Sequence, residues 1–140
     1  MPDPQPLDLV LVEDNEDHAL LVEKTLSAER ICNRLTVFQD AESALSHLRS
    51  GAAERPQLIL LDINLPGMDG LQLLKELKTD ENLKKVPVVI LSTSDAESDR
   101  SRAYAHSANS YLVKPVDFQK FRQMIRDVGL YWGLWNQPPA

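Results

Sequence analysis

Short apolar runs alternate with segments of helical periodicity along the whole chain. The apolar runs at residues 58–61 and 88–91 have no polar position, which is typical of central parallel strands that are buried on both faces. Alternating strands and helices favour an α/β fold, with one parallel sheet covered by helices on both sides. The predicted strands are Leu9–Val12, Leu35–Phe38, Leu58–Leu61, Val88–Leu91 and Tyr111–Val113.

Helices are predicted between these strands by apolar residues at helical spacing and by capping residues. Asp40 and Gly51 bracket the second helix, and Asp69 caps the third. The fifth helix starts at Asp117. The first helix carries His18, Leu21, Val22, Thr25 and Leu26 on one face, and the fifth carries Phe118, Phe121, Ile125 and Val128.

The fourth predicted helix, over residues 95–108, differs from the others in composition. Ser94, with Glu97 three residues later, predicts a capping box at its start. The segment is rich in Ser, Arg and Ala and has few large apolar residues. We therefore expect this helix to pack shallowly and to be the least stable of the set.

The composition indicates one globular domain. The chain has 140 residues, of which 43% are apolar and 26% charged. A formal charge of −6 without a dense Lys/Arg block argues against a phosphate-backbone binder, so no nucleic-acid partner is expected. The N-terminus does not resemble a signal peptide, and no apolar run approaches the ~18 residues of a membrane span, so we expect a cytoplasmic protein. Cys32, the single cysteine, is interpreted as a reduced, passive thiol.

Polar residues that a core would tolerate poorly follow four of the predicted strands. Ligands of an open α/β sheet bind beyond the carboxyl ends of its strands, so these side chains are expected to share one pocket. A single acidic residue at a strand end is more often a helix cap, but four strand ends together favour a site. The residues are Glu13 and Asp14 after the first strand, Asp62 after the third, Ser92 and Thr93 after the fourth, and Lys114 after the fifth.

The expected site combines a metal ion with phosphoryl chemistry. Clustered carboxylates repel one another and predict a bound cation, and Mg²⁺ takes one or two carboxylates together with phosphate oxygens. Asp14 and Asp62 are the expected ligands, with Glu13 bound directly or through water. Asp62, at the tip of a rigid central strand, is also the best nucleophile for forming an aspartyl phosphate. Lys114 and Ser92 are then placed to hold phosphoryl oxygens.

These residues, with the stretch Leu60–Gly70 and the Lys114-Pro115 pair, resemble the signature of response-regulator receiver domains of two-component systems. The resemblance spans residues 7–128 and implies a flavodoxin-like, five-stranded parallel sheet of order 2-1-3-4-5. It implies a signalling switch that assists only its own phosphorylation and dephosphorylation, not an enzyme, and a sensor histidine kinase as the donor. It also implies a cis bond between Lys114 and Pro115.

The resemblance assigns a role to each site residue. Glu13, Ser92 and Thr93 stand where this family more often has Asp, Thr and Ala. None of these departures removes a needed group. The bulkier Thr93 is expected to narrow access to the acyl phosphate and so to affect its lifetime. By resemblance, Asp62 is the phospho-acceptor, Lys114 the phosphoryl-binding lysine, Ser92 and Tyr111 the hydroxyl and aromatic switch residues, and Glu13, Asp14, Asp62 and the Asn64 carbonyl the metal ligands.

The C-terminal segment, residues 129–140, is an aromatic tail that follows the receiver domain of residues 1–128, and no output domain is expected. It contains Tyr131, Trp132 and Trp135, which require burial either on their own domain or in an intermolecular contact. We expect a homodimer through the fourth helix, fifth strand and fifth helix that covers these aromatic residues. The ending resembles stand-alone response regulators that partner bacterial phytochrome histidine kinases.

Two other classes of protein are alternatives. A haloacid-dehalogenase-type phosphatase also uses an Asp nucleophile after an apolar strand, but it needs a second Asp two positions later, where this chain has Asn64. A phosphorylation-independent pseudo-receiver that only binds partners would be expected to lack the acidic pair, the acceptor or the lysine, all of which are present.

Overall fold

The computed structural model describes residues 7–30, 32–51 and 55–136. Its five strands are all parallel and form one sheet in the order β2-β1-β3-β4-β5, as predicted. The strands are β1 (Leu7–Val12), β2 (Cys32–Phe38), β3 (Leu58–Leu61), β4 (Val88–Ser92) and β5 (Ser110–Val113).

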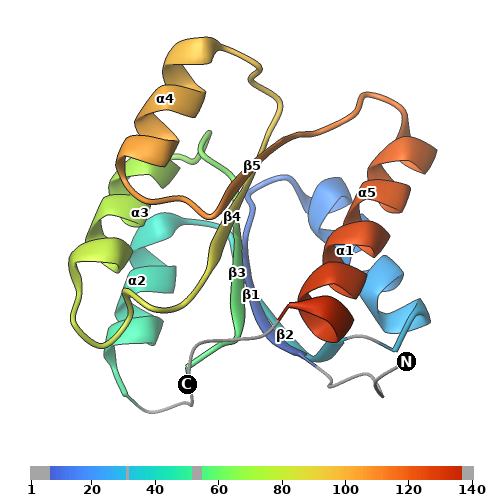
Figure 1. The fold of residues 1–140 in the computed structure, drawn as a ribbon, viewed down its shortest axis with the longest axis horizontal. Helices are drawn as coiled ribbons and strands as arrows, with labels where there is room; N and C mark the ends of the chain where they lie inside the picture. The colour runs from blue at the N-terminus through green and yellow to red at the C-terminus, as the bar shows by residue number, and fades with distance from the viewer. Residues whose placement is uncertain (1–6, 31, 52–54, 137–140) are drawn as a thin grey trace.

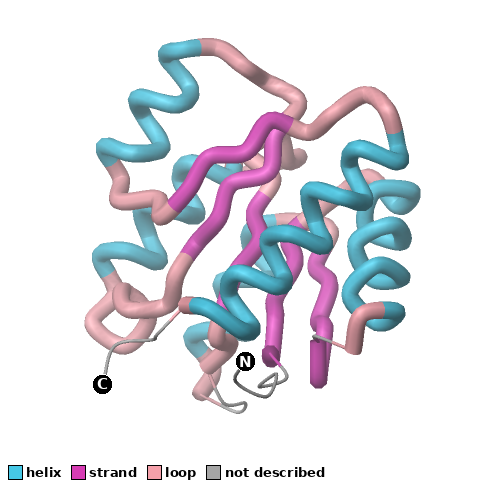
Figure 2. The backbone as a smooth tube through the Cα atoms, turned by 45° about the vertical axis from the view of Figure 1, so that its right-hand side comes forward, coloured by secondary structure: helices cyan, strands magenta, loops and turns pink. Residues whose placement is uncertain are grey.

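Helices cover both faces of the sheet. Helices α1 and α5 lie on one face, and α2, α3 and α4 lie on the other (Figure 1). The rotated view in Figure 2 shows the same three layers, with the strands between the two groups of helices. The helices are α1 (Glu16–Ala28), α2 (Ala41–Arg49), α3 (Gly70–Thr79), α4 (Glu97–Ala105) and α5 (Phe118–Leu130).

Alternate residues of the strands supply two hydrophobic cores, one on each face of the sheet. Ile59 and Leu61 of β3 pack with the residues of α2, α3 and α4. Leu58 and Leu60 point the opposite way and pack with Phe121 of α5 and the apolar face of α1. All residues of β3 are therefore buried, which explains why this run has no polar position.

Three of the predicted helix caps are confirmed. Asp40 accepts a hydrogen bond from the Ser43 amide at 2.7 Å, and Asp69 accepts one from the Gln72 amide at 2.8 Å. Asp117 accepts from the Gln119 and Lys120 amides at the start of α5. These bonds satisfy amide groups that a helix start leaves without an intrahelical partner.

The predicted capping box of α4 is wrong. The helix is capped by Ala96 without a side-chain hydrogen bond, and it is shorter than predicted. The Ser94 hydroxyl instead accepts a hydrogen bond from the Ala96 amide at 3.3 Å and donates one to the Asp99 carboxylate at 2.6 Å, neither of which is the predicted pairing with Glu97. The expectation of shallow packing is confirmed, since Ala103 is the one residue of α4 that is buried.

The C-terminal part of the described chain continues α5 as one π-helical turn over Tyr131–Trp135. Trp132 packs against the core between the sheet and helices α1 and α5, whereas Tyr131 and Trp135 are 52% and 59% exposed. Residues 137–140 of the predicted tail lie outside the described residues. None of the helices in the described ranges is long and apolar enough to cross a membrane.

Two further expectations are corrected at the start of α5. Phe118, predicted on the core face, is 58% exposed, because it occupies the first turn of the helix. The Lys114–Pro115 peptide bond is trans rather than cis. The two isomers of such a bond differ little in free energy, so sequence alone does not decide between them.

Candidate functional site

The carboxyl ends of the strands bring the predicted site residues to one edge of the sheet. The connections from β4 to α4 and from β5 to α5 leave this edge at the top of Figure 1. Sheet-like hydrogen bonding continues past the strand ends, because the Asp62 amide donates to the Val12 carbonyl and the Lys114 amide to the Ser92 carbonyl. The backbone of both residues is therefore fixed by neighbouring strands.

Glu13, Asp14 and Asp62 form an acidic cluster in which one carboxylate oxygen from each lies within 4.8 Å of the others. Glu13 and Asp62 are buried, whereas Asp14 is exposed. Hard oxygen ligands of this kind, open to solvent on one side, fit a Mg²⁺ ion that retains several waters. The three predicted carboxylates thus meet at one point.

Lys114 is the buried cation of this cluster. Its ammonium group donates to Glu13 Oε1 and to Asp62 Oδ2, the latter at 3.0 Å. It also lies 3.1 Å from Nδ1 of His18, a residue of α1. A lysine ammonium has three hydrogens and no acceptor, so each hydrogen of Lys114 has one partner.

Burial changes the acid–base behaviour of two neighbours of Lys114. The pKa of Glu13 is raised to about 7, first by burial and then by the adjacent Asp62 carboxylate, against the opposing effect of Lys114. The pKa of His18 is lowered from its ordinary value, first by burial and then by the positive charge of Lys114. The lowered pKa favours a neutral His18 ring.

The acceptor loop holds the Asp62 carboxylate in one orientation. Oδ1 accepts from the Asn64 amide at 2.9 Å, and Oδ2 faces Lys114. Gly70 closes this loop, with its amide donating to the Ile63 carbonyl at 3.1 Å. A Cβ atom on Gly70 would lie 2.3 Å from the Asp62 carbonyl oxygen, so only glycine fits this approach.

Ser92 and Tyr111 are linked through Ser94. The Ser92 hydroxyl oxygen accepts from the Ser94 amide at 3.0 Å and from the Asn64 side-chain amide at 3.4 Å. The Tyr111 hydroxyl donates to the Ser94 carbonyl at 2.8 Å, and its ring is buried. Tyr111 thus points inward in this structure.

Sequence reasoning missed the part that three residues play at this site. From the sequence, His18 is expected on one face of the first helix and Ser94 at a helix cap, and Gly70 has no expected role. A signal for His18 was present, because a histidine in the first helical turn after an acidic pair lies beside the strand end. Nothing local indicated that the Ser94 backbone joins Ser92 to Tyr111.

Comparison with known proteins agrees with this geometry. The response regulator receiver domain family matches residues 9–126. FilR2 of Methanothrix harundinacea, a probable methanogenesis regulatory protein, is 36% identical over 138 residues, which cover 96% of this chain and 89% of FilR2.

Two solved structures extend the similarity to the whole described fold. Phosphorylated RcpA, a cyanobacterial phytochrome response regulator, has a TM-score of 0.93 at 33% identity, over 97% of this chain and 100% of RcpA. The Mn²⁺-bound response regulator Rcp1 of Synechocystis has a TM-score of 0.90 at 34% identity, over 96% of this chain and 100% of Rcp1. The chain therefore belongs to the family of response regulator receiver domains.

Proposed function

We propose that this chain is a single-domain response regulator that accepts a phosphoryl group on Asp62 in a Mg²⁺-dependent reaction and thereby switches its protein contacts. The observation that carries this proposal is the Lys114 ammonium, 3.0 Å from the Asp62 carboxylate and beside the cluster of Glu13 and Asp14. A nucleophile, a fixed cation and a set of metal-ligating oxygens are the parts that phosphoryl transfer to a carboxylate requires.

In the proposed reaction an Asp62 oxygen attacks the phosphorus of the donor, and the bond to the leaving group breaks as the acyl phosphate forms. Lys114 binds a phosphoryl oxygen through the ammonium that now faces Asp62. Asp14, Asp62 and the Asn64 carbonyl would hold Mg²⁺, with Glu13 as a further ligand directly or through water. When bound, the ion neutralises the charge of the transferring group.

The switch uses the link through Ser94. The Ser92 hydroxyl turns toward the phosphoryl group and gives up the Ser94 amide, which frees the segment whose carbonyl holds Tyr111. Support comes from the 3.0 Å and 2.8 Å hydrogen bonds that join Ser92 to Ser94 and Ser94 to Tyr111. The phosphoryl group biases an equilibrium that exists before phosphorylation.

The proposed donor is a sensor histidine kinase of the phytochrome type. This partner is inferred from RcpA, whose name describes it as a phytochrome response regulator and which this chain matches along its full length. The signal then passes to a partner through a surface of the receiver.

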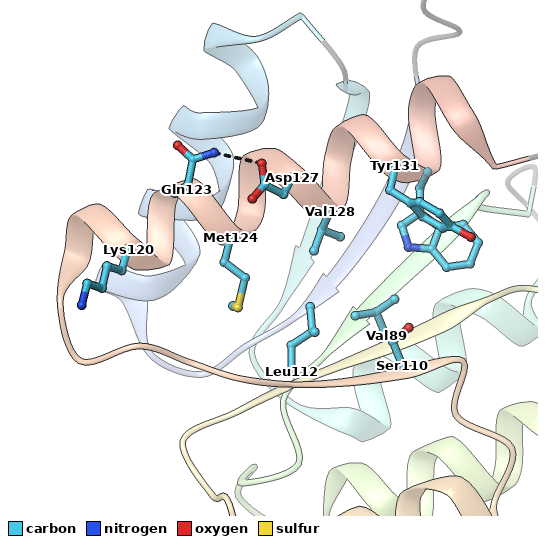
Figure 3. Close-up of a pocket in the computed structure, with 10 residues that line it drawn as sticks. Val89, Ser110, Leu112, Lys120, Gln123, Met124, Asp127, Val128 and Tyr131 are labelled. Carbon is cyan, nitrogen blue, oxygen red and sulfur yellow. Dashed lines mark hydrogen bonds between the residues drawn. The ribbon is translucent and has the colours of Figure 1, made fainter.

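The proposed surface is the face of α4, β5 and α5, where two copies form a homodimer. Between α5 and β5 lies a cavity of about 560 Å³, in which Met124 and Val128 face Leu112 (Figure 3). The exposed Tyr131 and Trp135 extend from the end of the same helix. A two-fold contact here would remove these aromatic side chains from water.

Intact mass spectrometry after incubation with Mg²⁺ and a small acyl-phosphate donor tests the proposal. The chain is expected to gain one phosphoryl group, and Asp62→Asn is expected to gain none while keeping its fold. Asp127→Asn, at an exposed position on α5, is the matched control and should be labelled like the unchanged chain. Full labelling of Asp62→Asn would show that another residue is the acceptor.

The same experiment separates the alternatives. A phosphatase would turn over phosphomonoesters continuously, but Asn64 supplies an amide near Ser92 where that chemistry needs a carboxylate. A pseudo-receiver would gain no phosphoryl group, yet the buried lysine and carboxylates that it would lack are in contact here.

A further inference from the structure

Lys114 has a third partner that the proposed reaction does not use. We infer that His18 is a positioning residue, whose Nδ1 accepts a hydrogen bond from Lys114 and orients the ammonium group toward the phosphoryl acceptor. This inference rests on the proposed function of Asp62. The contact joins α1 to the end of β5, two elements that are far apart in the sequence.

The hydrogen bond defines the state of the His18 ring. The Lys114 Nζ atom lies 3.1 Å from Nδ1, and an ammonium can only donate. Glu13 Oε1 lies 3.6 Å from Nδ1, which is too far for a hydrogen bond, so we assign the lone pair to Nδ1 and the ring hydrogen to Nε2. The lowered pKa of His18, which follows from burial and from Lys114, agrees with a neutral ring.

His18 is held in place through its backbone and its ring. The His18 backbone amide donates to the Asn15 side chain at 3.1 Å, which fixes the first turn of α1. The Phe121 ring packs edge-on at 5.3 Å, and the Phe118 ring packs at 6.5 Å. The His18 side chain is 20% exposed, and its Nδ1 lies 3.6 Å from Glu13 Oε1, so the ring borders the ammonium beside the Glu13 carboxylate.

A neutral hydrogen-bond acceptor suits this position better than a carboxylate or an apolar side chain. A carboxylate would add a third negative charge around Lys114 and would compete with the incoming phosphoryl oxygens. An apolar side chain would leave one ammonium hydrogen without a partner in a buried site, which is costly. The imidazole fixes the direction of the ammonium and leaves its charge available.

The contact to His18 does not conflict with phosphoryl binding. A phosphoryl group on Asp62 would take over the hydrogen that now points to the Asp62 carboxylate, while the hydrogen on the other side stays with His18. The His18 contact thus anchors Lys114 both before and after transfer. Its loss should slow phosphoryl acceptance and leave Mg²⁺ affinity nearly unchanged, because His18 is not among the clustered carboxylates.

Two variants separate orientation of Lys114 from simple packing. His18→Asn keeps an oxygen acceptor near the position of Nδ1 but removes the ring that packs on Phe121. His18→Leu fills the space against Phe121 but has no acceptor. We expect the rate of phosphorylation by a small acyl phosphate to fall about tenfold in His18→Leu, the size of one hydrogen bond to a charged group, and less in His18→Asn.

A packing role predicts the reverse order, with His18→Asn the slower and less stable variant, and that result would overturn the inference. Equal rates in both variants and in the unchanged chain would overturn it as well.

An NMR measurement does not depend on phosphorylation. Long-range ¹H–¹⁵N spectra should show the His18 hydrogen on Nε2, and the Lys114 ammonium signal should be protected from exchange in the unchanged chain and in His18→Asn but not in His18→Leu. These signals would remain even if the chain accepted no phosphoryl group. A failure of the proposed function is therefore distinguishable from a failure of the inference about His18. A hydrogen on Nδ1 would refute the inference.

Discussion

The Lys114 ammonium lies 3.0 Å from Oδ2 of Asp62 and also pairs with Glu13, so that one buried cation serves two buried carboxylates. Asp14 adds a further carboxylate on the exposed side of the cluster. The cluster therefore has more negative than positive charge before any phosphoryl group arrives. A divalent cation would correct this imbalance, and it would compete with Lys114 for the same oxygens.

Removal of the lysine should therefore have opposite effects on stability and on metal binding. Without metal, Lys114→Ala leaves two buried carboxylates without their cation and should lower the free energy of unfolding by about 3 kcal/mol. Mg²⁺ should then restore more stability to the variant than it adds to the unchanged chain. Thermal unfolding with and without Mg²⁺ measures both effects.

The matched control is Lys84→Ala, which removes an exposed lysine from its surface pair with Glu81 and should change stability little. If Lys114→Ala and Lys84→Ala were equally stable in the absence of metal, Lys114 would not be the counter-charge of the cluster.

Asp14→Ala should weaken Mg²⁺ binding about tenfold or more, since it removes a ligand from the solvent side of the site. The fold should be unaffected because Asp14 is exposed. Asp17→Ala is the control, as it removes the same charge from an exposed position nearby that is outside the cluster. Titration calorimetry with Mg²⁺ compares the two, and equal affinities would exclude Asp14 as a ligand.

Gly70→Ala tests how closely the acceptor loop is packed. The added Cβ would lie 2.3 Å from the Asp62 carbonyl oxygen and 2.5 Å from the Ile63 Cα atom, both of them backbone atoms that cannot turn away. We expect a loss of about 3 kcal/mol in the free energy of unfolding and slower labelling of Asp62.

Gly51→Ala is the control for a glycine effect without a clash. Gly51 has a φ of +69° but open space around its Cα, so the loss should be only about 1 kcal/mol, from the left-handed backbone alone. A Gly70→Ala variant as stable as Gly51→Ala would show that the backbone of the acceptor loop can shift to accommodate the added Cβ atom.

The sheet and the position of the site could be predicted because they depend on strong local signals. The run Leu58–Leu61 has no polar residue and is followed by Asp62, so both the buried central strand and the acceptor at its carboxyl end follow from the sequence pattern. Capping by Asp40 and Asp69 depends on a side chain that bonds within its own turn, which sequence also shows.

The contacts that the sequence did not reveal depend on partners far along the chain. Ser94 has the spacing of a cap, but its hydroxyl bonds Ala96 and Asp99, and its carbonyl accepts a hydrogen bond from Tyr111 on another element of the fold. The His18 ring fits the helical pattern of a core face, and its contact with Lys114 spans 96 residues. Local spacing places His18 beside the strand end, but it does not identify Lys114 as the partner.

The last prediction concerns the homodimer and uses the difference between the aromatic residues at the end of α5. Trp132 packs against the core of its own domain, so its replacement would affect folding as well as association. Tyr131 and Trp135 are more than half exposed, so their replacement by serine should cost the monomer little stability while removing much of the apolar surface that a second copy would cover.

The double variant Tyr131→Ser/Trp135→Ser should therefore be monomeric at a concentration where the unchanged chain is dimeric. At low concentration its unfolding temperature should be only slightly lower, because the edge-on contact of Tyr131 with Trp132 is lost. Val37→Ser is the control, because Val37 is 37% exposed on β2, at the opposite edge of the sheet from β5, and its replacement should not alter association. Sedimentation velocity, with and without a phosphoryl mimic, measures the state of each chain. If the unchanged chain sediments as a monomer under both conditions at micromolar concentration, the exposed aromatic residues do not form the proposed homodimer.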